Sequence, residues 1–137
     1  MWDVVSPLVQ KLSTKTDEIS FISNGVLTLG VEIELQLIDP STYNLSSRAE
    51  ELLTATAAMR KVKPEFYLSM IEINTDKCND VNEAAKDLRA TLQDLIPIAE
   101  NMGIRFSSTA SHPFAKYSDC IIAPGERYQN RYVFNIN

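Results

Sequence analysis

The sequence contains few residues of the kinds that build disulfides, histidine metal sites or phosphate-binding loops. Its 137 residues include two cysteines, four glycines and one histidine. Cys78 and Cys120 form no CxxC pair, so we expect free thiols and a reducing, cytoplasmic setting. The single histidine, His112, excludes a zinc site built from several histidines. The one glycine in "PGER", residues 124–127, is too weak a signal for a phosphate-binding loop.

Long apolar runs and an excess of positive charge are also absent. The first residues, "MWDVVSPLVQKLSTKTDE", are too polar for a signal peptide or a membrane span. The chain has 13 basic and 18 acidic residues and a net charge of −5. This balance argues against nucleic acid and anionic membranes as partners, because both attract basic patches. The length and the ordinary composition predict one domain, residues 1–137, with its own core.

Hydrophobic periodicity predicts that strands and helices alternate along the chain. Residues 26–38 alternate apolar and polar side chains, which is typical of a strand with one buried face. Ser47 and Glu50 have the spacing of a capping box at the start of a helix. The predicted elements are a short helix over 3–12 interrupted by Pro7, a strand over 26–38, a turn over 39–44, a helix over 46–60, a strand over 66–75, a helix over 81–102, a strand over 104–108 and a helix beginning at 126.

The longest predicted helix covers residues 81–102. Asp80 is placed to cap its first turn, and Gly103 is placed to end it. Pro97 lies inside the helix and should kink or split it. The apolar residues recur at helical spacing and predict one buried face, formed by Val81, Ala84, Ala85, Leu88, Leu92, Leu95, Ala99 and Met102.

The order of the predicted elements is compatible with two fold classes. Strict alternation of strand and helix favours a parallel α/β sheet. Strands that helices cover on both faces rarely carry a polar face, yet the strands over 26–38 and 66–75 each carry one. We therefore expect an α+β fold, in which an antiparallel sheet has helices packed on one face and its other face open toward a site.

Two glutamates stand one residue apart in "LGVEIELQLIDP", residues 29–40. On a strand, Glu32 and Glu34 project from the same face, about 7 Å apart. Glu72 lies on the polar face of the second strand, so three carboxylates converge if the two strands are neighbours. A hard, oxygen-seeking cation such as Mg2+ or Mn2+ would then balance their repulsion. The alternative is a solvent-facing strand surface, which is common in antiparallel sheets.

The segment "ASHPFAKY" contains the only histidine and also has two interpretations. His112 could contact a ligand, or it could cap a turn before Pro113. The pattern alone favours the turn, because a histidine beside a proline in a loop carries no specific signal for a binding site.

Three motifs taken together resemble the N-terminal part of the carboxylate–amine ligases of the glutamate–cysteine ligase type 2 family. They are "TLGVEIELQLIDP", "KVKPEFYLSMIEINTDKC" and "SHPFAKY", in this order, and they span most of the chain. The resemblance implies a fold related to glutamine synthetase, with a curved antiparallel sheet whose concave face holds ATP, magnesium and the substrates. It also implies a reaction in which ATP phosphorylates a carboxylate, typically the γ-carboxyl of glutamate, and an amine attacks the acyl phosphate to give an amide.

The same resemblance implies metal ligands. Glu32 and Glu34 match the glutamates of the first strand that hold magnesium, and Glu72 matches the ligand on the second strand. Glu65 matches an acidic position that helps to bind a further metal. Carboxylates carried on strands are better fixed than carboxylates carried on loops, which suits a phosphoryl-transfer reaction that depends on alignment.

The resemblance further implies substrate-binding residues. Asn74 and Thr75 match the stretch that lines the substrate pocket. His112 matches the histidine of the family's Gly-Thr-His-Pro-Phe loop, which here begins with Ala110 and Ser111. The serine keeps a hydroxyl group, whereas the alanine has less backbone freedom than glycine.

Family members run to more than twice this length. The resemblance therefore implies that a later histidine-containing strand, the phosphate-binding arginines and the rest of the sheet lie outside this chain, which we expect to be inactive alone. The expected partners are ATP, an amino-acid carboxylate, an amine acceptor, and either a second copy of the chain or a completing C-terminal polypeptide, because half a sheet exposes an edge. The alternative is a non-catalytic module that binds a metal, a nucleotide or a protein partner.

Overall fold

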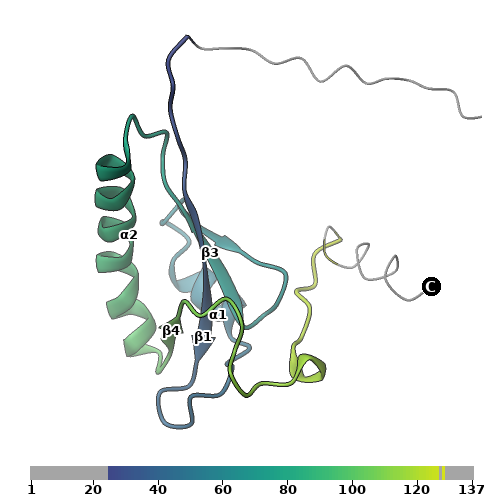
Figure 1. Ribbon diagram of the computed structural model, residues 1–137. Helices are drawn as coiled ribbons and strands as arrows, with labels where there is room; N and C mark the ends of the chain where they lie inside the picture. Colours follow the sequence, from purple (N-terminus) through teal and green to yellow (C-terminus); the bar gives the residue numbers. More distant parts are fainter. Residues whose placement is uncertain (1–24, 127, 129–137) are drawn as a thin grey trace, which may run out of the picture.

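The computed structural model describes residues 25–126 and residue 128 (Figure 1). In this part of the chain, the elements follow the order β1 (Glu32–Ile38), α1 (Ala49–Ala55), β2 (Val62–Pro64), β3 (Met70–Asn74), α2 (Val81–Asn101) and β4 (Arg105–Ser107), and then the short 3-10 helix η2 (Tyr117–Asp119). The helix predicted over 3–12 and most of the helix predicted from 126 lie outside the described residues.

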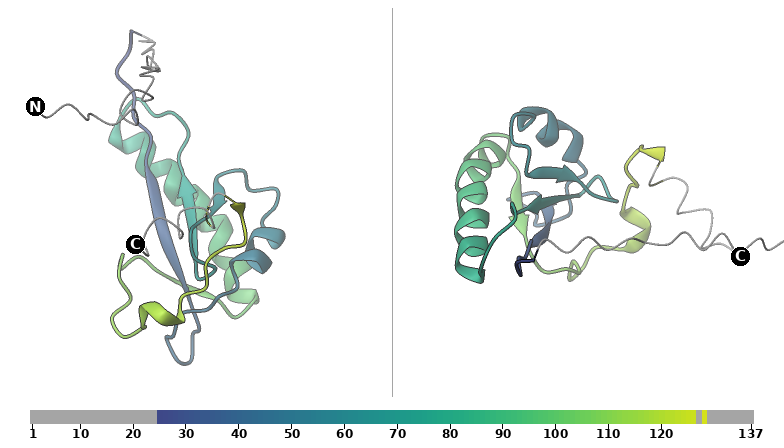
Figure 2. Two further views of the ribbon diagram at one scale, coloured as in Figure 1. Left: turned by 90° about the vertical axis from the view of Figure 1, so that its right-hand side faces the viewer. Right: turned by 90° about the horizontal axis from the view of Figure 1, so that it is seen from above.

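The strands form one antiparallel sheet in the order β2-β3-β1-β4. The helix α2 lies along one side of this sheet, and the segment after β4 passes to the opposite side (Figures 1 and 2). Both features confirm the predicted α+β class with an antiparallel sheet.

The core lies between the apolar face of the sheet and the two α-helices. Alternation along β1 and β3 directs every second side chain into it, as predicted. The strand predicted over 26–38 nevertheless begins only at Glu32, and Val26 and Leu27 are exposed. Each fully buried leucine or isoleucine contributes about 1.5–3 kcal/mol relative to an exposed one. The buried members of this core are Leu35, Leu37, Ala49, Leu52, Val62, Ile71, Ile73, Leu95, Ala99 and Ile104.

The start of α1 differs from the prediction. The helix begins at Ala49 with Arg48 at its N-cap position, and no side chain caps it. The predicted capping box between Ser47 and Glu50 is therefore wrong. The backbone N–H of Ala49 instead donates to the carbonyl of Leu68, 2.9 Å away, so a tertiary hydrogen bond satisfies one of the free donors at the helix start.

The ends of α2 agree with the prediction. The carboxylate of Asp80 accepts hydrogen bonds from the backbone N–H groups of Asn82 and Glu83, at 2.7 and 2.9 Å. Gly103 follows the helix with φ of 68°, a left-handed conformation that favours glycine and ends helices. Of the two effects predicted for Pro97, a split is wrong, because α2 continues without interruption from Val81 to Asn101. A kink at Pro97 stays a prediction.

The apolar face of α2 is shorter than predicted. Val81 is 71% exposed and Ala85 is also exposed, so neither belongs to the core. Helical spacing identifies the residues that share a face, but it does not indicate how far along the helix a packing partner extends.

The second strand predicted over 66–75 is shorter and has an unpredicted neighbour. The strand β3 begins only at Met70, and residues 66–69 form a turn with one isolated bridge. The segment "KVKPEF", expected only to break a helix, contains the strand β2, which pairs with β3. Pro64 is compatible with this strand because β2 is at the edge of the sheet, where a missing N–H leaves no partner unsatisfied.

Candidate functional site

The polar side chains of β1 and β3 share the sheet face that lies opposite the helices. In the antiparallel register, Glu34 is directly opposite Glu72, and Glu32 is directly opposite Asn74. Directly opposed side chains have Cβ atoms about 4.5–5.5 Å apart. Glu32 and Glu34 are exposed, whereas Glu72 and Asn74 are half-buried. The two strands are therefore neighbours, as a site built from three carboxylates requires.

Asn74 connects two of the three glutamates. Its amide nitrogen Nδ2 donates to Oε1 of Glu32, 3.0 Å away, and to Oε1 of Glu72, 2.8 Å away. The side-chain amide oxygen Oδ1 is buried and has no hydrogen-bond partner among the described residues. A buried polar atom without a partner costs free energy, so this oxygen is an unsatisfied acceptor among the described residues.

The donor chemistry of this face suits a hard divalent cation. Its available groups are carboxylate and amide oxygens, the ligand types that Mg2+ and Mn2+ prefer. Within residues 25–126 and 128, however, no three His, Cys, Asp or Glu side chains are gathered closely enough to form a metal site. The metal-ligand roles of Glu32, Glu34 and Glu72 therefore stay predictions.

The strand β3 lies between β1 and β2. Glu72 of β3 is directly opposite Glu34 of β1 on one side and directly opposite Lys63 of β2 on the other. Glu72 thus has a carboxylate neighbour on one side and an ammonium neighbour on the other. Lys63 was not among the predicted site residues, because the segment that forms β2 was predicted only to break a helix. The available signal was the spacing Lys-Val-Lys, which places the apolar Val62 on one face and the lysine on the other.

Thr75 and Glu65 do not contact the three glutamates. The hydroxyl oxygen of Thr75 accepts a hydrogen bond from the backbone N–H of Val31, and the backbone N–H of Thr75 donates to the carbonyl of Val31, both at 2.9 Å. Thr75 therefore extends the pairing of β1 with β3. Glu65 follows Pro64, which pairs with Ile71, so it lies toward the opposite end of β3 from Asn74. The role of Glu65 in binding a further metal stays a prediction.

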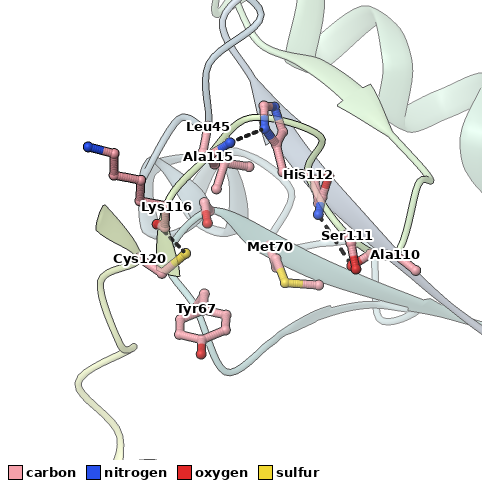
Figure 3. Close-up of a pocket in the computed structure, with 11 residues that line it drawn as sticks. Leu45, Tyr67, Met70, Ala110, Ser111, His112, Ala115, Lys116 and Cys120 are labelled. Carbon is pink, nitrogen blue, oxygen red and sulfur yellow. Dashed lines mark hydrogen bonds between the residues drawn. The ribbon is translucent and has the colours of Figure 1, made fainter. Parts of the chain in front are cut away.

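His112 fastens a turn with both ring nitrogens. Its Nδ1 atom accepts a hydrogen bond from the backbone N–H of Ala115, 3.1 Å away (Figure 3). A neutral ring then carries its proton on Nε2, which donates to the carbonyl of Tyr43 at 2.9 Å. The ring also packs edge-on against Phe114. These contacts match the turn interpretation of His112, and its substrate-binding role stays a prediction.

Ala110 adopts the backbone conformation that its family counterpart, glycine, would adopt easily. Its φ is 54°, in the left-handed region that disfavours residues with a Cβ atom. The carbonyl of Ala110 accepts a hydrogen bond from Nε2 of Gln36, 3.4 Å away, which helps to hold this conformation. The alanine therefore keeps a glycine-like path at this point of the loop.

A second charged cluster lies beside the sheet, where Lys61 contacts two carboxylates. Its Nζ atom pairs with Asp87 and with Asp76, the latter at 2.9 Å. The backbone N–H of Asp76 also donates to Asp87, 2.8 Å away. The hydrogen bond to Asp87, followed by that to Asp76, raises the pKa of Lys61, and the hydrogen bond from Lys61 lowers the pKa of Asp87. Arg60 also pairs with Asp76, at 2.7 Å, so the two carboxylates are matched by two positive charges within the chain.

Comparisons with known proteins point to one family. Residues 28–133 match the model of glutamate–cysteine ligase family 2. The chain is similar to proteins named "Putative glutamate–cysteine ligase 2" from Bdellovibrio bacteriovorus, at 38% identity over 85% of this chain, and from Gloeobacter violaceus, at 40% identity over 81%. A protein of the same name from Bordetella avium is 33% identical over 82%.

The shared region is a limited part of each relative. It covers 31% of the Bdellovibrio and Gloeobacter proteins and 29% of the Bordetella protein. The match nevertheless extends over most of this chain and includes the strands that carry the polar face. In addition, the helices within residues 25–126 are all too short or too polar to cross a membrane. The chain belongs to glutamate–cysteine ligase family 2.

Proposed function

We propose that this chain supplies part of the ATP- and magnesium-binding face of a carboxylate–amine ligase. In such a reaction, ATP phosphorylates the carboxylate of one substrate, and the amine of a second substrate attacks the resulting acyl phosphate. The products are an amide, ADP and phosphate. Glutamate is the expected donor of the carboxylate, in agreement with the names of the relatives.

The residues of the polar face would act by holding and aligning charge. Glu34 and Glu72, directly opposite each other, would provide carboxylate oxygens to Mg2+ or Mn2+, and Glu32 would add a further oxygen. A bound divalent cation supplies charge neutralisation for the phosphates of ATP. Asn74 would keep Glu32 and Glu72 oriented through its two donated hydrogen bonds.

One observation carries this proposal: the glutamates of two neighbouring strands face the same side, and the amide between them leaves a buried oxygen without a partner. Like charges placed opposite each other destabilise a sheet. A protein that needs no cation would gain stability by replacing one of them. A metal–nucleotide complex would reverse the repulsion and would also supply a partner for the amide oxygen.

The test is a calorimetric titration of the chain with ATP, with and without magnesium. Wild type should bind ATP only when magnesium is present, and Glu32→Gln combined with Glu34→Gln should abolish that binding. A matched control is Glu50→Gln combined with Glu100→Gln, which removes two exposed carboxylates from the helical region. If the Glu32 and Glu34 double variant binds magnesium and ATP as wild type does, these residues are not the ligands.

A second candidate function is a non-catalytic module that binds a metal, a nucleotide or a protein partner. The observation in its favour is that no three metal-binding side chains are gathered in the described residues. The chain also spans only about a third of the length of its relatives. Magnesium-dependent nucleotide binding without amide formation, when glutamate and a panel of amines are supplied, would support this candidate.

We also propose that the sheet is completed by another polypeptide segment, as in a glutamine synthetase-like fold. Among the described residues, β4 pairs with β1 only at residues 36–38, so residues 32–35 have no strand neighbour on that side. Unpaired edges attract further strands. A second copy of the chain is one such partner, so light scattering at micromolar concentration should show a dimer or larger assembly. A monomer would exclude a second copy of the chain as the partner, and the sheet would then have to be completed by a different polypeptide.

A further inference from the structure

Lys63 is the first residue in a row of three charged side chains that crosses β2, β3 and β1. Lys63 is directly opposite Glu72, which in turn is directly opposite Glu34. Val62 belongs to the core and Lys63 is exposed, so the lysine shares the polar face with the two glutamates. Neighbouring strands lie about 4.8 Å apart. The row therefore places a positive charge beside the pair of carboxylates proposed to bind the metal.

The ammonium group of Lys63 has no ion-pair partner in the part of the chain that the structure describes. Its neighbour Glu72 instead accepts a hydrogen bond at Oε1 from the amide of Asn74, 2.8 Å away. Lys61, two residues earlier, is the opposite case, because two aspartates hold its ammonium group. Of two lysines in the same short segment, one is thus held inside the chain and the other is not.

A lysine on an edge strand also has a purely structural explanation. Charged side chains on such a strand discourage pairing with a further strand, and lysine is especially common there. This explanation requires a charge but no ligand, and it predicts that Lys63 contributes nothing to the binding of an anion. A role as counter-ion of Glu72 is a weaker explanation, because the two residues form no ion pair.

The charge balance of the polar face favours a second cation beside the metal. Glu32, Glu34 and Glu72 together carry more negative charge than one Mg2+ can balance. A magnesium–ATP complex is itself negative, so this face would repel the phosphates unless a further positive charge lay beside them. An ammonium group binds phosphate as a point charge, and the flexible stem of lysine lets it follow the ligand. In the row of three charged residues, Lys63 is the one that can supply this charge.

We propose that Lys63 binds a phosphate oxygen of a metal-bound polyphosphate, with the metal held by Glu34 and Glu72. The phosphate chain would then extend from the carboxylates toward the edge strand β2. The identity of the polyphosphate as ATP rests on the proposed function, whereas the contact with Lys63 can be tested with inorganic tripolyphosphate. In this role Lys63 is a ligand-binding residue, which aligns the phosphates and does not hold the metal.

The experiment compares the binding of a metal with the binding of a metal–polyphosphate complex. Mn2+ alone is titrated into the 137-residue chain and followed by the loss of the free-ion signal in electron paramagnetic resonance. Magnesium tripolyphosphate, magnesium–ATP and L-glutamate are titrated separately by calorimetry. Wild type should bind Mn2+ and both magnesium polyphosphates. Tripolyphosphate lacks the nucleoside, so a loss of affinity that it shares with ATP must arise at the phosphates.

Three variants isolate the contact. Lys63→Met should weaken both magnesium polyphosphates by about 10–100-fold, the value of a hydrogen bond to a charged group. It should bind Mn2+ at least as tightly as wild type, because it removes a positive charge beside Glu72. Lys63→Arg keeps the charge and should bind the polyphosphates within about 3-fold of wild type. Lys86→Met, which removes an exposed lysine of α2 on the helical side of the sheet, is matched for net charge and should change neither affinity.

The outcomes separate the Lys63 contact from the proposed function. Polyphosphate binding by Lys63→Met equal to that of wild type would overturn the proposal and leave the edge-strand explanation. Equal losses of Mn2+ and polyphosphate affinity would also overturn it, because Lys63 would then act through the metal site. A loss confined to L-glutamate would assign the lysine to a carboxylate instead.

Two further outcomes concern the proposed function itself. If Lys63→Met loses polyphosphate binding while the Glu32 and Glu34 double variant retains it, the lysine contact stands and the metal-ligand assignment fails. If folded wild type binds neither polyphosphate, both proposals are overturned.

Discussion

Two charged regions border β3 and distribute their charge in opposite ways. In the cluster of Lys61, Asp76 and Asp87, the lysine contacts both carboxylates, so each charge has an opposite partner inside the chain. On the polar face, Glu34 and Glu72 are opposed as like charges. The carboxylates of the cluster join Lys61, which immediately precedes β2, to α2 and to the segment after β3. Among the described residues, the carboxylates of the polar face form no ion pair.

Carboxylates that stabilise the fold are thus distinguished from carboxylates that could bind a ligand by whether a cation lies beside them. An internal ion pair stabilises the fold but has little attraction left for an external ion. Carboxylates kept together without such a partner oppose folding, yet they attract a cation. We therefore expect changes in the cluster to alter stability alone, and changes on the polar face to alter the response to divalent ions.

The largest effect is expected for Asn74→Asp. The change removes the donor that bridges Glu32 and Glu72 and adds a negative charge between them. The free energy of unfolding should fall by about 2–3 kcal/mol in EDTA, because charge-assisted hydrogen bonds are lost and like charges are added. Magnesium should restore part of this loss. Urea unfolding in EDTA and in magnesium provides the measurement.

Asn82→Asp is the matched control for that variant. It makes the same chemical change at an exposed position in the first turn of α2, where a negative charge is favourable. Its stability should equal or slightly exceed that of wild type in both conditions. If Asn74→Asp lowers the free energy of unfolding equally in EDTA and in magnesium, the polar face responds to divalent ions no more than the Lys61 cluster does.

A smaller effect is expected for Lys61→Met. Loss of the ammonium group should lower the free energy of unfolding by about 1 kcal/mol near neutral pH, because Asp76 and Asp87 lose a charged donor. Magnesium should not restore it. Lys86→Met, which changes an exposed lysine of α2, is the control and should leave stability almost unchanged.

Lys61→Met should also make the free energy of unfolding less dependent on pH. Hydrogen bonds lower the pKa of both aspartates below the ordinary value of 3.8. For Asp87 the largest cause is the hydrogen bond from Lys61; for Asp76 it is the hydrogen bond from Arg60, followed by that from Lys61. Their contribution to stability is therefore present above that value and is lost as the pH falls through the lowered pKa. Lys61 has a raised pKa, so its own contribution is lost only above 10.5. Urea unfolding between pH 7 and pH 3 should show a smaller decrease for Lys61→Met than for wild type; an equal decrease would contradict this assignment.

The smallest effect is expected for Arg60→Gln. The guanidinium group contacts both carboxylate oxygens of Asp76 at 2.7 Å, but the side chains are 73% and 49% exposed. Solvent and salt screen such a pair. The unfolding midpoint should move less than in Lys61→Met, and the difference from wild type should disappear in molar salt. A loss as large as that of Lys61→Met would mean that the exposed arginine, and not the lysine, holds the cluster together.

Much of the fold follows from local pattern. The alternation around β1 predicted which side chains enter the core, and Asp80 and Gly103 marked the two ends of α2 because their effects on the helix are local. The strand β2 was missed because it has only three residues and includes a proline, so the Lys-Val-Lys alternation is too short to distinguish a strand from a loop. The capping box at Ser47 was wrong because a tertiary hydrogen bond to Leu68 took its place.

Part of the candidate site could likewise be predicted from local pattern, and part could not. The sequence indicated that Glu32 and Glu34 share a strand face, because side chains alternate with a period of two. It could not show that Glu34 is opposite Glu72, that Lys63 lies beyond it, or that Asn74 joins two carboxylates, since these depend on strand register. The burial of the Ser69 hydroxyl, which has no hydrogen-bond partner among the described residues, could not be predicted either, because burial depends on segments distant in the chain.

The family, the polar and apolar faces of the long strands and the limits of the long helix could therefore be predicted without a structure, because all of them depend on neighbouring residues or on motifs. Only the tertiary structure decided which charges are neutralised inside the chain and which remain directed outward. The physical reason is that pairing depends on distances between side chains of different strands and helices, and those distances exist only after the sheet has formed.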